Sequence, residues 1–141
     1  VGIAPMLLLA KKLKMNGFQP EVLIGGRTSD DIVEPEKYEP YGPVYITTDN
    51  GSAGEKGMVT QHSVFSGDLT RYSAIYACGP DPMMKAVARV AAVHNVYCEI
   101  SLENTMACGI GACLCCVEDT IDGHVCTCTE GPVFNLKQLK W

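Results

Sequence analysis

Four cysteines in the last third of the chain have a spacing suited to binding a metal centre. They are Cys108, Cys113, Cys116 and Cys128, spaced C-x4-C-x2-C-x11-C. This spacing is typical of the thiolates that hold a plant-type [2Fe–2S] cluster. Gly109 and Gly111 allow the loop to fold back, because glycine reaches positive φ without steric cost. A short hairpin would bring the fourth thiolate from a separate segment. The pattern therefore indicates one-electron chemistry.

The spacing alone leaves the fourth ligand open, since Cys126 and Cys128 lie two residues apart and share one face of an extended segment. Cys115 is adjacent to Cys116, so its side chain should leave the loop in another direction. Zinc is the main alternative occupant. Structural zinc sites usually carry two C-x2-C knuckles, however, and only Cys113 and Cys116 form one here. Inert buried cysteines are a weaker explanation, because they would not be expected to cluster with glycines at this spacing. Disulfides are weaker as well, because they need an oxidising compartment and nothing resembles a signal peptide.

Composition narrows the class of protein. The chain has 141 residues, of which 47% are hydrophobic and 19% charged, as in one compact soluble domain with a small appendage. A net charge of −5 without a basic stripe argues against nucleic acid as a partner. No stretch approaches the roughly 20 apolar residues that span a bilayer, so we expect no membrane partner. Eight cysteines without a secretory signal favour the reducing cytoplasm.

The elements that would position these cysteines alternate along the chain. Helices are expected at 5–15, where Pro5 opens the first turn and Gly17 ends the helix, and at 82–93. Shorter helical segments are expected at 29–38 and 58–65. Strands are expected at 21–24, 44–48, 74–78 and 96–102. This order predicts an α/β fold, with a parallel sheet and crossover helices.

Several loops should meet at the carboxyl ends of these strands, where α/β sheets bind ligands. They are 25–28, 47–51 and 78–80, together with the glycine turn 1–5 that leads into the first helix. A helix N-terminus after a glycine turn is a natural site for a pyrophosphate. Each loop is weak evidence alone, but together they favour a dinucleotide crevice.

Longer motifs carry a family resemblance. Residues 2–5 (GIAP) and 76–80 (YACGP), with Met83 following, resemble the NAD(P)-binding domain of the ferredoxin reductase superfamily. Residues 101–113 and 128–134 closely resemble the iron–sulfur electron-transfer subunits of NAD-dependent dihydroorotate dehydrogenases. The resemblance implies an NAD-binding parallel sheet with helices on both faces over 1–102, followed by a cluster-binding domain over 103–141. It also selects Cys128 over Cys126.

The resemblance implies an oxidoreductase subunit with a [2Fe–2S] cluster, FAD and NAD. Electrons would come from a partner FMN-containing TIM-barrel subunit that oxidises dihydroorotate in pyrimidine biosynthesis, within a heterotetramer. Two alternatives remain. One is a diaphorase-type subunit of another oxidoreductase, linked to sulfide or ferredoxin. The other is a non-enzymatic module in which a metal only stabilises the fold.

The resemblance also suggests roles for single residues. The pyrophosphate loop would be Gly2, Ile3, Ala4 and Pro5; the nicotinamide would face Cys78, Gly79 and Pro80, with Met83 beside them and Cys78 as the catalytic residue. Thr48 and Asp49 are candidates for the ribose or form an ordinary turn. Arg27 would reach the adenosine end or is a surface charge. Glu103 would lie near the flavin or is a surface carboxylate, and no histidine is given a role.

One departure from the family concerns the start of the chain. The family carries an upstream β-barrel that binds FAD, then a first central strand, whereas this sequence begins inside the glycine turn at Val1 and Gly2. We interpret the sequence as the C-terminal portion of a longer polypeptide, and expect sheet edges to be exposed without that strand. The tail 134–141 should pack either on this domain or on a partner.

Overall fold

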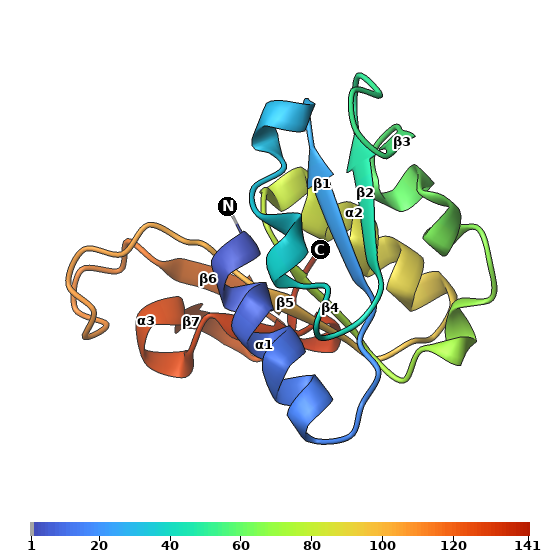
Figure 1. Ribbon diagram of the computed structural model, residues 1–141. Coiled ribbons are helices and arrows are strands. Elements are labelled where there is room, and N and C mark those ends of the chain that lie inside the picture. The colour runs from blue at the N-terminus through green and yellow to red at the C-terminus, as the bar shows by residue number, and fades with distance from the viewer. Residues whose placement is uncertain (1) are drawn as a thin grey trace. The chain divides into compact units, whose positions relative to one another are not determined.

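A computed structural model describes residues 2–141 (Figure 1). The chain forms two compact units: the first ends at Asp68 and the second is Leu69–Trp141. Both units combine helices with parallel strand pairs, so the predicted α/β class is confirmed. The expected domain boundary between residues 102 and 103 stays a prediction. None of the helices within residues 2–141 is long and apolar enough to cross a bilayer.

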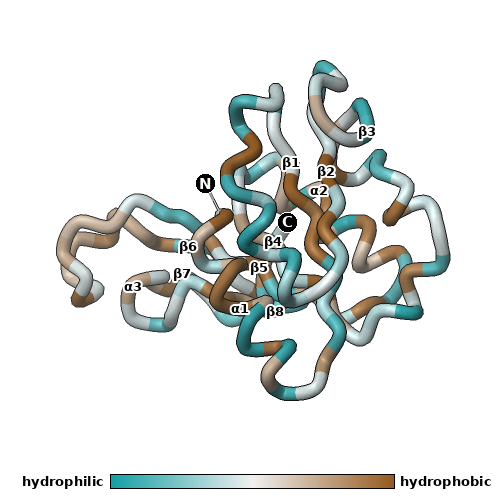
Figure 2. The backbone as a smooth tube through the Cα atoms, in the orientation of Figure 1, coloured by the Kyte–Doolittle hydropathy of each residue, from teal (hydrophilic) through white to brown (hydrophobic). Residues whose placement is uncertain are grey.

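The first unit contains one long helix and one small sheet. Helix α1 (Ile3–Met15) is followed by strands β1 (Val22–Gly26), β2 (Val44–Thr48) and β3 (Glu55–Lys56), which pair in parallel in that order. Strands β1 and β2 carry hydrophobic residues, coloured brown in Figure 2. Apolar residues of both strands pack with those of helix α1 in one hydrophobic core. Ala10, Ile24 and Tyr38 are its buried centre. The Tyr38 hydroxyl donates to the Ile3 carbonyl, which ties the start of α1 to this core.

Each of the two short helices expected in this unit occurs instead as a pair of separate 3₁₀ turns. They are η1 (Ser29–Asp31) and η2 (Pro35–Lys37) in place of 29–38, and η3 (Val59–Gln61) and η4 (Ser63–Phe65) in place of 58–65. Pro35 disfavours helical backbone in the residue before it, which separates η1 from η2. His62 is extended, with φ −60° and ψ 145°, and it separates η3 from η4.

The second unit holds a mixed sheet and a hairpin. Strands β4 (Ile75–Cys78) and β5 (Cys98–Ser101) are parallel, and β8 (Val133–Asn135) adds antiparallel to β5. Helix α2 (Asp81–Val93) connects β4 to β5. Strands β6 (Val117–Thr120) and β7 (Gly123–Cys126) form the expected hairpin; 3₁₀ turn η5 (Leu69–Arg71), helix α3 (Thr127–Glu130) and 3₁₀ turn η6 (Leu136–Gln138) complete the unit. The fully buried Ile100 lies at the centre of the β4-β5-β8 sheet.

The expected parallel sheet occurs as two three-stranded sheets in which β1 and β4 are edge strands. Residues 2–141 contain no strand ahead of α1 to pair with either edge. The open question about the tail is settled in favour of this domain, because Leu139 is buried and pairs with Thr120 of β6.

Candidate functional site

The predicted cluster ligands lie on one loop and the hairpin that follows it. We call residues 105–116 the cysteine loop. Its folding back relies on positive φ at Gly109 (70°), Gly111 (74°) and Leu114 (59°). The backbone N–H of Cys113 donates to Cys108 Sγ over 3.4 Å, and Cys126 Sγ–H donates to the Gly111 carbonyl over 3.9 Å. The Cys126 thiol of the hairpin therefore lies beside the cysteine loop.

Backbone and thiol donors around these sulfurs favour thiolates. Hydrogen bonds from the backbone of Cys115 and from the side chain and backbone of Cys108 lower the pKa of Cys113 to about 6. The backbone N–H of Cys128, followed by its side chain, lowers the pKa of Cys116. Since metals bind the deprotonated thiol, this donor set fits the chemistry of an iron–sulfur cluster.

The assignment of the four cluster ligands stays a prediction. Burial raises the pKa of Cys126, and a hydrogen bond to Cys116 raises that of Cys128. The charge and a hydrogen bond of Cys116 also raise the pKa of Cys126, so both sulfurs lie close to Cys116. Neither is therefore distinguished as the fourth ligand. Within residues 2–141 no three His, Cys, Asp or Glu side chains converge closely enough to hold a metal ion.

In the first unit, the predicted pyrophosphate loop leads into α1. Gly2 is buried and has a left-handed φ of 83°, and α1 begins directly at Ile3. Ala4 and Pro5 lie in the first helical turn. The predicted turn-to-helix geometry is thus present, while its role in binding phosphate stays a prediction. Val1 lies outside the described residues.

Two more of the predicted nucleotide loops lie side by side in this unit, at the ends of β1 and β2. The N–H of Asp49 donates to the Gly26 carbonyl over 3.1 Å, and the N–H of Asn50 donates to the Arg27 carbonyl over 3.3 Å. Thr48 is fully buried, and its hydroxyl donates to the Ala53 carbonyl over 2.7 Å. Thr48 therefore shapes the turn from within, whereas Asp49 and Arg27 are exposed.

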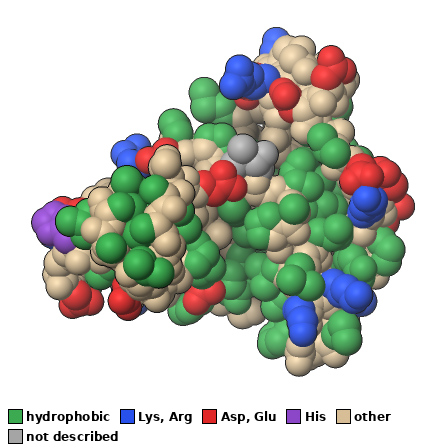
Figure 3. All heavy atoms as spheres, turned by 90° about the vertical axis from the view of Figure 1, so that its left-hand side faces the viewer, with side chains coloured by type: hydrophobic (Ala, Val, Ile, Leu, Met, Phe, Trp, Pro, Cys, Tyr) green, Lys and Arg blue, Asp and Glu red, His purple; other side chains and the backbone are tan. Residues whose placement is uncertain are grey.

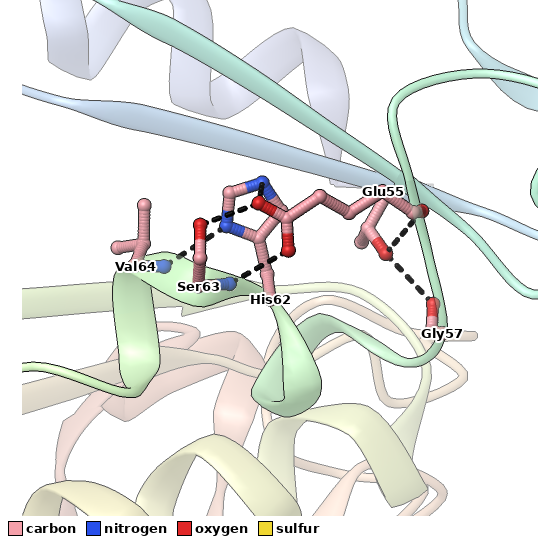
Figure 4. A network of polar contacts seen from close by, with 6 residues as sticks. Glu55, Gly57, His62, Ser63 and Val64 are labelled. Carbon is pink, nitrogen blue, oxygen red and sulfur yellow. Dashed lines mark hydrogen bonds and ion pairs between the residues drawn. The ribbon is translucent and has the colours of Figure 1, made fainter.

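A buried histidine supports the same turn, and no short-range pattern in the sequence predicts this role. His62 is only 4% exposed; its Nδ1 accepts the Val64 N–H over 3.1 Å and its Nε2 lies 3.4 Å from Glu55 Oε1 (Figure 4). The Ser63 N–H also donates to Glu55 over 2.8 Å. Glu55 lies in β3, seven residues from His62, so this network fixes the end of the turn that begins at Thr48.

The predicted nicotinamide-facing residues lie in the second unit, between β4 and α2. Cys78 ends β4, Gly79 has φ 152°, and Pro80 caps α2. The Cys78 thiol donates to Glu103 Oε1 over 3.7 Å. Burial raises the pKa of Cys78, a hydrogen bond with Ser101 lowers it, and the charge and hydrogen bond of Glu103 raise it. Cys78 is thus held as a neutral thiol; Ser101 is a contact that the sequence did not reveal.

Replacing Glu103 with Gln is expected to lower the pKa of Cys78, because the neutral amide no longer repels the thiolate. Below that pKa the thiolate fraction grows as the pKa falls, so alkylation of Cys78 near neutral pH should accelerate roughly threefold or more. Mass-spectrometric mapping of iodoacetamide adducts measures this. Glu99→Gln, elsewhere on β5, is the control and should leave the rate at Cys78 unchanged. A slower reaction in Glu103→Gln would contradict the assigned contact.

Gly79→Ala is expected to lower the free energy of unfolding by about 1–2 kcal/mol, because an L side chain is strained at this backbone angle. The added Cβ would also lie 2.5 Å from Met83 Cε and displace that side chain. Urea denaturation measures the loss. Gly67→Ala is the matched control, since its added Cβ meets nothing within 4 Å. Equal stability of the two variants would show that the angle at Gly79 is not constrained.

Comparison with known proteins finds similar domains for the cysteine-rich region and for the fold as a whole. Residues 103–140 match the iron–sulfur cluster binding domain of dihydroorotate dehydrogenase B. A chain of the NADH-dependent reduced ferredoxin–NADP oxidoreductase, from a structural study of flavin-based electron bifurcation, aligns with a TM-score of 0.86 and 33% identity, covering 100% of this chain and 51% of that one. The fold is therefore of the ferredoxin-reductase type, with an appended iron–sulfur domain, as predicted.

Similar proteins of known name point to a narrower class than the domain and fold matches do. The chain is 44% identical over 138 residues to the electron transfer subunit of dihydroorotate dehydrogenase B (NAD(+)) from Caldanaerobacter subterraneus, covering 95% of this chain and 53% of that protein. It is 34% identical over 142 residues to the probable electron transfer subunit from Methanocaldococcus jannaschii, covering 100% and 54%. The predicted resemblance to these subunits is confirmed, and the chain spans about half the length of the curated relatives it matches.

Proposed function

We propose that this chain belongs to the electron-transfer subunit of an NAD-dependent dihydroorotate dehydrogenase in pyrimidine biosynthesis. The similarity to such subunits over 95% of the chain is the observation that carries the proposal. The partner would be an FMN-containing TIM-barrel subunit that oxidises dihydroorotate, within a heterotetramer in the cytoplasm. When bound, a [2Fe–2S] cluster passes single electrons and FAD converts them in pairs to the hydride that NAD⁺ accepts.

Each unit of the chain would contribute its own part. Cys108, Cys113, Cys116 and Cys128 would hold the cluster, because donors around Cys113 and Cys116 favour the thiolate form. Gly2–Pro5 would bind the pyrophosphate of NAD, and Asp49 would contact its ribose. Cys78, Gly79 and Pro80 would face the nicotinamide, where a neutral Cys78 thiol would add no charge. FAD would be bound mainly by a domain upstream of these residues.

Exposed apolar side chains on the cysteine loop support a partner at this position. Met106 is 47% exposed, Ile110 74% and Leu114 64%. Figure 3 faces the side that carries the loop and shows hydrophobic side chains gathered there. Apolar groups around a redox centre suit a contact that excludes water when an electron donor docks.

The deciding experiment is electron paramagnetic resonance on anaerobically purified, dithionite-reduced protein, with iron and zinc assayed on the same sample. A rhombic S = 1/2 signal together with bound iron would support the [2Fe–2S] carrier. One zinc per chain without a signal would overturn it and leave a module in which a metal only stabilises the fold.

A second candidate is a subunit of a ferredoxin-linked oxidoreductase, and the match to the NADH-dependent reduced ferredoxin–NADP oxidoreductase favours it. The full-length protein, purified with its partner, separates the two. Reduction of NAD⁺ driven by dihydroorotate would support the main proposal. Electron exchange with reduced ferredoxin, without a response to dihydroorotate, would support the second candidate.

A further inference from the structure

Both ends of the cysteine loop are joined by one side chain. Asn104 immediately precedes the loop, and Cys116 ends it. The Asn104 side-chain amide donates to the Cys116 carbonyl over 3.5 Å and to Glu118 Oε2 over 3.1 Å. Glu118 lies in β6, directly after the loop. These two hydrogen bonds close the base of the loop through side chains.

The other carboxylate oxygen of Glu118 is held by the chain's single tryptophan. Trp141 Nε1–H donates to Glu118 Oε1 over 3.3 Å. The Trp141 ring also receives the ammonium group of Lys85, which lies 5.3 Å from the ring centroid and belongs to α2. Such a cation–π contact is favourable within about 6 Å. Trp141 therefore connects the base of the cysteine loop to the helix that follows Cys78–Pro80.

The tail that presents Trp141 is itself fixed on the hairpin. The Ile121 N–H donates to the Gln138 carbonyl over 2.9 Å, and Leu139 pairs with Thr120 while only 6% exposed. Trp141 thus approaches Glu118 from an ordered segment. A hydrogen bond between preorganised groups costs less conformational entropy than one between mobile side chains.

The cysteine loop has little regular structure of its own, since residues 105–116 form neither helix nor strand. Much of the loop is exposed, including Met106, Ile110 and Leu114. Contacts at the two ends of the cysteine loop must therefore do much to hold its conformation. Cys116 is buried at one end, whereas Cys113 is exposed within the loop, so movement of the base changes the separation of these two sulfurs.

We propose that Asn104, Glu118 and Trp141 form a clamp that positions the cysteine loop, holding Cys116 in place relative to Cys108 and Cys113 before a cluster is assembled. They are positioning residues and bind no cluster atom themselves. The proposal rests on the proposed function only in naming the cluster as the ligand of the loop. The clamp itself is a property of the chain without metal.

The test is hydrogen exchange on the full chain without metal, comparing Asn104→Ala and Trp141→Phe with the parent. Trp141→Phe keeps an aromatic ring beside Lys85 but removes the indole N–H that donates to Glu118. Because hydrogen bonds to a charged carboxylate are among the stronger ones in proteins, amides of residues 105–116 should exchange about tenfold faster in both variants. Peptides from β4 and α2 (residues 75–93) should not change, which shows that the second unit is folded in both variants.

Asp119→Asn is the matched control, because Asp119 neighbours Glu118 but pairs with Lys140 over 2.8 Å at the surface. It should exchange like the parent. Unchanged exchange of residues 105–116 in both clamp variants would overturn the proposal, as would an equal acceleration in Asp119→Asn.

A second measurement separates failure of the clamp from failure of the proposed function. After reconstitution with iron and sulfide, the clamp variants should release iron to a chelator about tenfold faster than the parent. If the parent binds no iron while the variants still accelerate exchange, the proposed function fails and the clamp stands. If the parent holds a cluster and neither readout responds to the variants, the clamp fails and the function stands.

Discussion

Cys116→Ser is expected to abolish cluster binding, with bound iron and the electron paramagnetic resonance signal falling to background after reconstitution. Cys116 is the most buried thiol of the cysteine loop, at 1% exposure, and its sulfur accepts the backbone N–H of Cys128. Serine keeps the size of the side chain but is a far weaker ligand for iron, since soft thiolates are what the cluster requires. Iron analysis and the spectrum of the reduced protein together measure the loss.

The comparison of Cys126→Ser with Cys128→Ser assigns the fourth ligand. The family resemblance selects Cys128, so Cys128→Ser should lose the signal and Cys126→Ser should keep it. Cys115→Ser serves as the control within the loop, because its thiol donates to the Cys113 carbonyl over 3.9 Å and is not an expected ligand. The reverse outcome at positions 126 and 128 would assign Cys126 as the ligand and contradict the assignment carried over from the family.

The long helices and buried strands could be predicted because their signals are local. Pro5 lies in the first turn of α1, which begins two residues earlier than expected, and Gly17 follows its end. The spacing of Met84, Val87 and Ala91 marks the buried face of α2. The two short helices were predicted wrongly, because 3₁₀ turns occur in their place. Tertiary contacts determine the backbone conformation of such short segments. His62 leaves the helical region since its imidazole is buried between Glu55 and Tyr45, a contact that sequence spacing does not reveal.

The site residues also divide into those with a local sequence signal and those brought together only by tertiary contacts. The cysteine loop could be proposed from the sequence because three of the predicted ligands and both glycines lie within nine residues of sequence. The ligand set itself stays a prediction. The supporting contacts were not predictable. Glu118 meets Trp141 only because the tail returns along β6, a separation of 23 residues. Ser101 reaches Cys78 only because β4 and β5 pair in parallel with these residues opposite one another.

Ile100→Ala is expected to lower the free energy of unfolding by about 3–4 kcal/mol, within the range of about 2–5 kcal/mol that is usual for such a change in a core. Ile100 is fully buried at the centre of its sheet, opposite Ala77 of β4 and Phe134 of β8, so the cavity cannot be filled by solvent. A domain of this size is stabilised by only about 5–15 kcal/mol. Urea denaturation followed by the emission of Trp141, which lies in the same unit, measures the change.

Ile121→Ala is the matched control, because Ile121 is 61% exposed in the β6–β7 turn and should cost no more than about 0.5 kcal/mol. A loss below about 1 kcal/mol in Ile100→Ala would contradict the core assigned to this unit. The consequence reaches the site, because β5 leads directly through Ser101 and Glu103 into the cysteine loop. Loosening this strand should therefore release Cys78 from Glu103, and alkylation of Cys78 should accelerate in Ile100→Ala but not in Ile121→Ala.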